Sequence, residues 1–295
     1  MKTNVIGILV RNLFILLLIS SNIFLYAQSV DENNIKVMTF NLRYDNQNDG
    51  LNQWSNRKKN VISMIKFYDA DILGTQEVLN SQKDYLETNL PEYTCVGVGR
   101  KDGINAGEFS ALFFKKNKFD IINSGTFWLS ETPEVTASVG WDAALERICT
   151  WVMLQDKYTN KIFYVFNTHF DHIGEKAREK SAELILNKIK EWSGDLPVFL
   201  TGDFNFDSSS VGYKTITKKG EYKLIDSEFI SKLPHHGPTW TFHGFDSVKI
   251  NERKKIDYIF VNDKVFVTKH GVLSDRFDGG YPSDHLPVLI EAELQ

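Results

Sequence analysis

P-V-F-L-T-G-D-F-N, residues 197–205, is an apolar run that ends in a glycine, a carboxylate and a carboxamide. Residues 197–200 have the composition of a short buried strand. Residues two apart in an extended segment point to the same face, so Asp203 and Asn205 would project together while Phe204 packs inward. Paired side-chain oxygens at a strand end are typical of a site for a hard cation or a phosphate. Gly, Asp and Asn are also ordinary turn residues, so the segment alone is equally consistent with a turn.

The same pattern, an apolar run bordered by polar residues, recurs along the chain. None of these runs needs a polar residue for folding, and in open α/β sheets binding sites lie outside the strand ends. The polar residues concerned are Asn41, Glu77, His169, Asp171, Asp203, Asn205, Asp257, Asp284 and His285. If these strand ends converge, the sequence predicts one polar site.

Hydrophobic periodicity predicts the elements of the fold. The predicted helices cover 54–68, 81–90 and 174–192. The predicted strands cover 35–41, 71–77, 109–115, 119–129, 147–154, 162–169, 256–261, 265–273 and 286–294, besides the strand at 197–200. Residues 206–250 show no clear pattern. Strands and helices occur both before and after residue 157, and two facing sheets covered by helices would bury this many strands. We therefore expect an α/β fold, a four-layer α/β/β/α sandwich of two mixed sheets.

Length and composition indicate one large globular domain after a targeting segment. The chain has 295 residues, of which 42% are hydrophobic and 24% charged. Residues 1–27 combine Lys2 and Arg11 with an apolar run and end in the small residue Ala27, which predicts a signal peptide cleaved near Ala27. An uncleaved anchor is the alternative. We expect residues 28–295 to form an exported catalytic domain without a membrane span, and a monomer.

Charge and cysteine content narrow the function classes. Removing residues 1–27 takes away two positive charges, so the formal net charge falls from −4 to −6. An acidic protein gains no long-range attraction to nucleic acid, which disfavours a general nuclease without excluding one. Two cysteines, Cys95 and Cys149, are too few for a Cys-rich zinc site. They are consistent either with a disulfide or with two buried thiols.

The predicted site has the chemistry of metal-assisted hydrolysis. Carboxylates from Glu77, Asp203 and Asp284, with amide oxygens from Asn41 and Asn205, favour Mg²⁺ or Mn²⁺ over Zn²⁺. His285 can transfer a proton, and a carboxylate such as Asp257 can fix its tautomer and raise its basicity. A hard cation beside such a histidine suits hydrolysis of a phosphate ester.

Six motifs in this chain resemble those of the endonuclease/exonuclease/phosphatase superfamily, which has the DNase I-like fold. They are N-L-R (41–43), Q-E (76–77), N-T-H-F-D-H (167–172), G-D-F-N (202–205), K-I-D-Y-I-F (255–260) and S-D-H-L-P (283–287). Their order and spacing match over essentially the whole mature chain. G-W-D-A-A-L-E-R (140–147) resembles a stretch of a secreted bacterial subgroup. The resemblance implies the same four-layer sandwich.

The resemblance also implies a role for each matching residue. Glu77 would bind the metal, Asn41 beside it would contact metal or phosphate, and Asp284 would be a further ligand or support one. Asp203 would orient or deprotonate the attacking water, and Asn205 would hold a phosphate oxygen.

The remaining roles concern the phosphate and the proton. His285, paired with Asp257, would contact the phosphate or exchange a proton. His169 would stabilise charge that develops on phosphorus, and Arg147 would reach the phosphate, a surface ion pair being its alternative.

These observations favour an exported Mg²⁺-dependent phosphoesterase, foremost a phosphodiesterase that attacks the P–O ester in line with water. A nuclease acting on extracellular nucleic acid and a non-catalytic phosphate-binding module are the alternatives. A calcineurin-like metallophosphatase is disfavoured because the chain lacks its G-N-H-E and late G-H-x-H motifs. The substrate class and the number of metal ions do not follow from the sequence.

Overall fold

A computed structural model describes residues 34–218, 222–278 and 280–295. The predicted signal peptide, with its cleavage point at Ala27, lies outside these residues. Within them, no helix is both long and apolar enough to cross a membrane.

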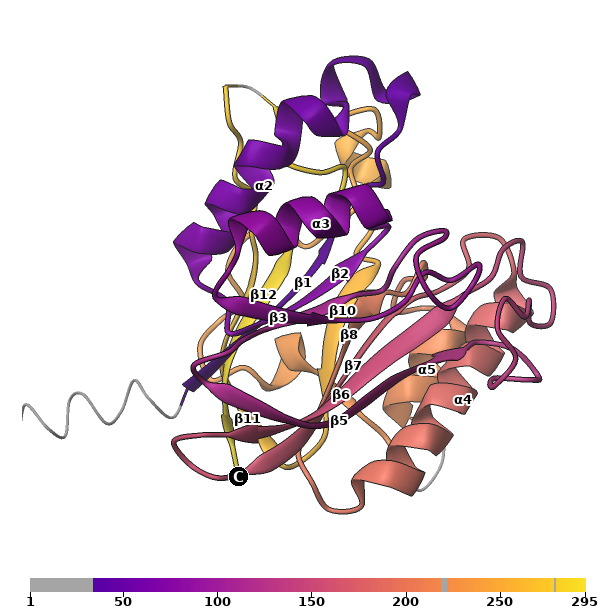
Figure 1. The fold of residues 1–295 in the computed structure, drawn as a ribbon, viewed down its shortest axis with the longest axis vertical. Helices are drawn as coiled ribbons and strands as arrows, with labels where there is room; N and C mark the ends of the chain where they lie inside the picture. The colour runs from indigo at the N-terminus through magenta and orange to yellow at the C-terminus, as the bar shows by residue number, and fades with distance from the viewer. Residues whose placement is uncertain (1–33, 219–221, 279) are drawn as a thin grey trace, which may run out of the picture. The chain divides into compact units, whose positions relative to one another are not determined.

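The described strands form two six-stranded sheets (Figure 1). The first sheet has the order β11-β12-β1-β2-β4-β3, with β1 Asn34–Asn41, β2 Ile72–Gln76, β3 Tyr93–Val96, β4 Leu112–Lys115, β11 Val265–Val272 and β12 Val288–Leu294. The second sheet has the order β5-β6-β7-β8-β10-β9, with β5 Phe119–Trp128, β6 Ile148–Asp156, β7 Ile162–His169, β8 Val198–Asp203, β9 Ile225–Asp226 and β10 Asp257–Val261. Both sheets mix parallel and antiparallel pairs.

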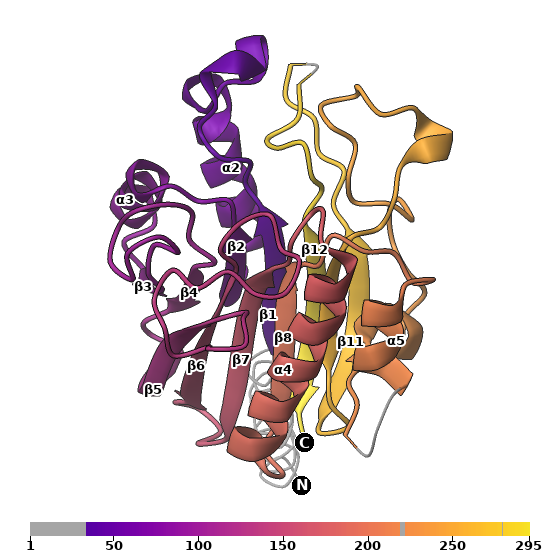
Figure 2. The same ribbon diagram turned by 90° about the vertical axis from the view of Figure 1, so that its right-hand side faces the viewer.

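Helices cover the outer face of each sheet. They are α2 Trp54–Tyr68, α3 Asn80–Asn89, α4 Glu175–Ser193 and α5 Val211–Lys218, with short 3₁₀ helices η1 Gln47–Asn52, η2 Ser227–Ile230 and η3 Ile250–Glu252. Figure 2 shows α2 and α3 beside the first sheet and α4 and α5 beside the second.

Three apolar clusters hold these layers together. One lies between the sheets and includes Val37 and Phe199. Another joins the second sheet to α4 through Ile185, and a third joins the first sheet to α2 through Val61 and Ile65. Burial on both faces of each sheet confirms the predicted four-layer α/β/β/α sandwich.

Strand pairing brings the polar strand ends to one edge of the sandwich. In the first sheet β1 runs parallel to β2, so Asn41 and Gln76 are register partners and Glu77 follows directly. In the second sheet β7 runs parallel to β8, which pairs His169 with Asp203. Antiparallel β10 pairs Asp257 with Asp203.

A polar contact between the sheets lies close to this edge. Asn167 on β7 donates to the carbonyl oxygen of Thr75 on β2, at 2.8 Å, and accepts from Gln76 at 2.7 Å and from Thr201 at 3.0 Å. Gly74 permits the approach, because a Cβ there would lie 2.4 Å from Thr201 Oγ1 and 2.6 Å from Asn167 Oδ1. Neither sheet can shift across the other here without breaking these hydrogen bonds.

The structure adds a helix that the sequence did not predict and shows the state of the two cysteines. Helix α5 lies in the stretch without a clear pattern, and its glycine and threonines give it little intrinsic helix propensity. Its buried Tyr213 and Ile216 pack against the second sheet, so tertiary contacts stabilise it. Cys95 and Cys149 are free thiols, which excludes the disulfide of the two alternatives left open, but only Cys149 is buried and Cys95 is partly buried.

Candidate active site

A cavity of about 660 Å³ opens at the edge where the polar strand ends meet. Of the nine residues to which the family resemblance gives a role, seven line this cavity: Glu77, Arg147, His169, Asp203, Asn205, Asp284 and His285. The other two, Asn41 and Asp257, are fully buried behind it. The convergence that the sequence could only suggest is therefore present in the fold.

Left-handed backbone at three turns directs side chains at this edge. Arg43, Glu77 and Asn205 have φ values of 55°, 60° and 50°, in a region that residues with a Cβ seldom adopt. Each such residue costs on the order of 1 kcal/mol or more, so the surrounding contacts must hold it. Such strain is concentrated at functional sites, and here it occurs just after β1, β2 and β8.

Asn41 fixes the two carboxylates on the acidic side of the cavity. Its amide nitrogen donates to Glu77 Oε1 at 3.1 Å and to Asp203 Oδ2 at 2.9 Å. Its amide oxygen accepts from the backbone N–H of Arg43 at 2.9 Å. In this arrangement Asn41 positions the carboxylates, and its direct contact with a metal or phosphate stays a prediction.

The acidic side has the donor set for a hard cation. Ligand atoms from Glu77, His169 and Asp203 lie within 4.8 Å of one another. Burial raises the pKa of Asp284, and the charge of Glu77 raises it further. The nearest guanidinium, that of Arg43, is 3.8 Å from Glu77 and 3.9 Å from Asp284 and is already paired with Asp49 at 3.0 Å. Two carboxylates and an imidazole with surplus negative charge could hold a divalent cation.

The expected contact between His285 and Asp257 is present. His285 Nδ1 lies 2.9 Å from Asp257 Oδ2, and both side chains are buried. Burial alone would lower the pKa of His285, but the charges of Asp257 and Asp203 outweigh it and raise that pKa well above its ordinary value. These charges favour the imidazolium form of His285, whose Nε2 faces the cavity side at 3.8 Å from Asp203 Oδ2.

His169 is the second histidine beside Asp203, and its pKa is shifted in the opposite direction to that of His285. Its Nε2 is 3.6 Å from Asp203 Oδ2. Burial, then the charges of Arg147 and Arg100, lower the pKa of His169 well below its ordinary value, so this ring is neutral. Burial and Asp257 raise the pKa of Asp203 to about 7. Environments that separate the pKa values of neighbouring groups assign them different proton-transfer roles.

Arg147 is a buried guanidinium at the cavity wall, not a surface residue. It is 4% exposed, and its Nε donates to Asp171 at 3.3 Å while Nη2 lies 2.9 Å from His172 Nδ1. Its Nη1 is buried without a hydrogen-bond partner in the described part of the chain. Because Arg147 lines the cavity, its guanidinium contributes positive charge that suits a phosphate.

Glu108 is a site residue that the sequence reading missed. It lines the cavity, pairs with Arg100 through two contacts of 2.8 Å, and lies 3.7 Å from His169 Nδ1. Glu108 belongs to a loop and precedes only the isolated bridge between Phe109 and Val78. The one signal was a carboxylate between Gly107 and the apolar run at 109–115.

A two-sheet sandwich with acidic residues and histidines converging at one edge is the architecture of the DNase I-like phosphoester hydrolases. The model of the Endonuclease/Exonuclease/phosphatase family matches residues 38–285. The chain belongs to this family.

Solved structures and curated proteins include relatives of this chain. An endonuclease/exonuclease/phosphatase from Bacteroides vulgatus is 44% identical, with a TM-score of 0.86, and the match covers 89% of this chain and 99% of that one. A mannosyl-6-phosphatase from Bacteroides thetaiotaomicron is 41% identical, with a TM-score of 0.82, and the match covers 88% and 99%. Human nocturnin is 26% identical over 268 residues, and the match covers 81% of this chain but only 58% of nocturnin.

Proposed function

We propose that this protein is an exported, divalent-metal-dependent phosphoesterase that hydrolyses a P–O ester by in-line attack of water. The observation that carries the proposal is the set of charged groups around one cavity. Glu77 and Asp284 contribute negative charge, and His285 and Arg147 contribute positive charge. Such a cavity complements a metal-bound phosphate ester.

Glu77 and Asp284 would hold the cation, Mg²⁺ or Mn²⁺, and Asn41 would keep Glu77 in place. When bound, the cation would neutralise phosphate charge and stabilise the charge that develops in the transition state. Arg43, held by Asp49, would limit repulsion between the carboxylates.

The remaining residues act on the water and the phosphate. Asp203, with its raised pKa, would orient the attacking water and accept its proton. Neutral His169 would donate a hydrogen bond to a phosphoryl oxygen, and cationic His285 would stabilise the charge on phosphate or protonate the leaving oxygen. Asn205, whose amide nitrogen donates to the carbonyl of Phe170, leaves its amide oxygen as the group at the cavity wall.

The substrate that we favour is a small phosphate ester. A cavity of about 660 Å³ has the size of a small-molecule site. The similarity to a mannosyl-6-phosphatase makes a sugar phosphomonoester the first candidate. A small phosphodiester is the second candidate, and it is supported by the predicted site residues and the motifs in the sequence.

A substrate panel is expected to separate these candidates. With Mg²⁺, kcat/KM for hexose 6-phosphates should exceed that for bis-p-nitrophenyl phosphate and for single-stranded DNA and RNA by at least about tenfold, a difference of about 1.4 kcal/mol in transition-state binding. Release of inorganic phosphate and of p-nitrophenol measures the two ester classes. A preference for the diester would move the assignment to a phosphodiesterase, and a preference for nucleic acid would make it a nuclease.

Export has its own expected result. The mature protein should begin at or near Gln28, because Ala27 is the small residue that follows the apolar run. N-terminal sequencing of the protein from its native cell, after separation of the exported and cytoplasmic fractions, measures this. A cytoplasmic protein that keeps Met1 would refute export and leave the catalytic proposal untouched.

A further inference from the structure

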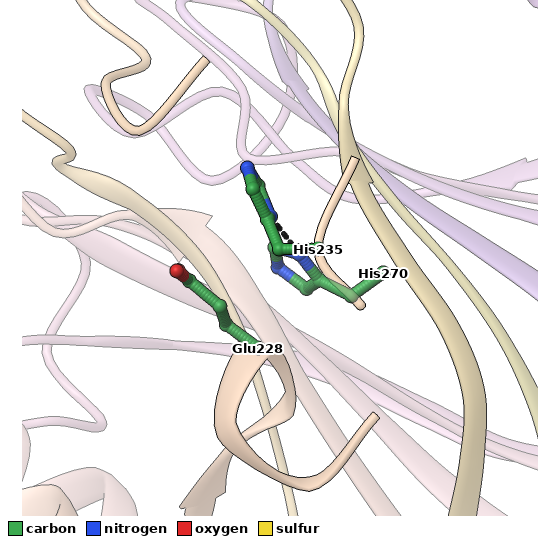
Figure 3. Close-up of side chains that lie close together, drawn as sticks. All are labelled: Glu228, His235 and His270. Atoms are coloured by element: carbon green, nitrogen blue, oxygen red, sulfur yellow. Dashed lines mark hydrogen bonds between the residues drawn. The ribbon is translucent and has the colours of Figure 1, made fainter. Parts of the chain in front are cut away.

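Three side chains that do not line the active-site cavity come together beside β11. Glu228 lies on η2, His235 follows in the segment 231–238, and His270 is on β11. One potential ligand atom from each lies within 4.8 Å of the other two. Figure 3 shows the two imidazoles next to each other, joined by a hydrogen bond, with the Glu228 carboxylate to one side.

The backbone explains why the two histidines meet. The segment runs along β11, where the N–H of His236 donates to the carbonyl of His270 at 3.1 Å and the N–H of Val272 donates to the carbonyl of His236 at 2.9 Å. His236 and Gly271 form a parallel bridge, so His235 and His270 are neighbours across it. Successive side chains alternate in direction, which directs His235 to the opposite face from the exposed His236.

The surrounding carbonyls fix the tautomer of His235. Its Nε2 lies 3.1 Å from the carbonyl oxygen of Gly237 and 3.0 Å from that of Pro238. A carbonyl oxygen only accepts, so Nε2 carries the proton, and Nδ1 of the neutral ring keeps its lone pair, which accepts the hydrogen bond from His270 Nδ1. A histidine that donates one N–H to a carbonyl and keeps a lone pair on the other nitrogen has the tautomer of a metal ligand.

His270 supplies a second lone pair in a buried place. The ring is 2% exposed, and its Nδ1 lies 2.9 Å from the unprotonated Nδ1 of His235. In the neutral pair His270 Nδ1 therefore carries the proton and donates the hydrogen bond. Its Nε2 is buried with no hydrogen-bond partner among the described residues. A buried polar atom without a partner costs free energy, which a bound cation would remove or offset.

The charges around the pair leave room for a cation. Glu228 and Asp226 share one ammonium, that of Lys255, at 2.6 Å and 3.2 Å. Two carboxylates against one ammonium leave a net charge of −1 beside two neutral imidazoles. A divalent cation is therefore attracted to the group although Lys255 is near.

We propose that His235 Nδ1, a ring nitrogen of His270 and a carboxylate oxygen of Glu228 form a second metal site, for a transition-metal ion such as Zn²⁺. Imidazole ligands favour Zn²⁺, Co²⁺ or Ni²⁺ over Mg²⁺, which distinguishes this site from the oxygen-rich active site. Tetrahedral bonds of about 2.0–2.1 Å place two ligand nitrogens about 3.3 Å apart, so a bound ion would replace the hydrogen bond between the two Nδ1 atoms, and the His270 ring would turn or move its proton to Nε2 to present a lone pair.

The position of the site indicates what metal binding would do. It would link the segment 231–238 to β11 through side chains as well as through the backbone. A few residues further on, Phe242 lines the active-site cavity and contacts the His285 ring at a centroid distance of 4.9 Å. A metal ion here would therefore stabilise the support of one cavity wall without entering the cavity.

Zn²⁺ binding to the metal-free full chain, in excess Mg²⁺, tests this site. Equilibrium dialysis should detect a Zn²⁺ ion bound per chain, and at about 100 times its Kd this ion should raise Tm by about 5–10 °C. His235→Gln should weaken binding by about 100-fold or more and lose the Tm increase. His236→Gln, which changes the adjacent exposed histidine, should keep both.

Further variants separate this site from the active site and from misfolding. Glu77→Gln, in the active site, should retain the Zn²⁺ ion, while Glu228→Gln should weaken its binding. Circular dichroism of each metal-free variant shows that it is folded before metal is added. Equal Zn²⁺ binding by His235→Gln and His236→Gln would overturn the proposal, as would loss of the ion in Glu77→Gln alone. Neither readout depends on hydrolysis, so failure here is distinguishable from failure of the proposed function.

Discussion

Removal of divalent cations should abolish phosphate-ester hydrolysis, and Mg²⁺ or Mn²⁺ should restore it. The carboxylates of Glu77 and Asp284 carry more negative charge than the guanidinium of Arg43 balances, and they would repel an anionic ester without a cation. We expect kcat/KM to fall by at least about 10³-fold in EDTA, a loss of roughly 4 kcal/mol of transition-state stabilisation. The measurement is phosphate release before and after EDTA, and after excess Mg²⁺ is added back.

A pair of variants locates the metal. Glu77→Gln preserves shape and removes one ligand charge, so the Mg²⁺ concentration at half-maximal activity should rise by about tenfold or more. Glu252→Gln changes another carboxylate that lines the cavity and should leave that concentration within about twofold. Full activity in EDTA would remove the metal from the proposal, and equal effects of the two variants would remove Glu77 from the metal site.

His285→Ala should lower kcat by about 10²–10⁴-fold, the usual contribution of a positioned proton donor or acceptor. Asp257→Asn should retain the fold and lose much of the same rate, because an amide can offer His285 Nδ1 the wrong hydrogen-bonding partner. The double variant should be little slower than His285→Ala, since residues that act as a unit are not additive. Losses that multiply would show that the two residues act separately.

The pH profile tests the charge state of His285. If the imidazolium is the active form, hydrolysis falls as pH rises through its pKa. Asp257 raises this pKa, so Asp257→Asn should lower it and move the alkaline limb of kcat/KM to lower pH. His236→Ala, at an exposed histidine, should leave the profile unchanged. An alkaline limb that does not move in Asp257→Asn would contradict the assigned role.

The residues at strand ends were predictable because strands carry a strong pattern. A buried strand does not require a carboxylate at its end, so Glu77 and Asp203 indicated a function other than folding. Order and spacing of the motifs then predicted the fold, and the structure places seven of the predicted site residues around one cavity, where their roles stay a prediction. The contact between His285 and Asp257 links residues 28 positions apart, and it was expected from the resemblance.

Other parts of the site depend on tertiary contacts that no local pattern records. Glu108 belongs to a loop, and only its pairing with Arg100 and its distance to His169 give it a place in the site. The meeting of His235 and His270 requires the segment 231–238 to run along β11, in a region where the sequence shows no periodicity. Hydrogen-bond partners, not residue types, determine which nitrogen of each ring is free.

The contact of Gly74 with Asn167 and Thr201 has a consequence for how this family can diversify. Glu77 and Asp284 belong to segments flanking the first sheet, whereas His169 and Asp203 belong to the second. The reacting groups keep their relative positions only while the two layers remain in register, and hydrogen bonds through Asn167 maintain that register. Loops at the cavity rim, such as the one carrying Leu145, take no part in this contact. Insertions and substitutions in such loops can therefore alter substrate selectivity over evolution while the hydrolytic chemistry is inherited unchanged.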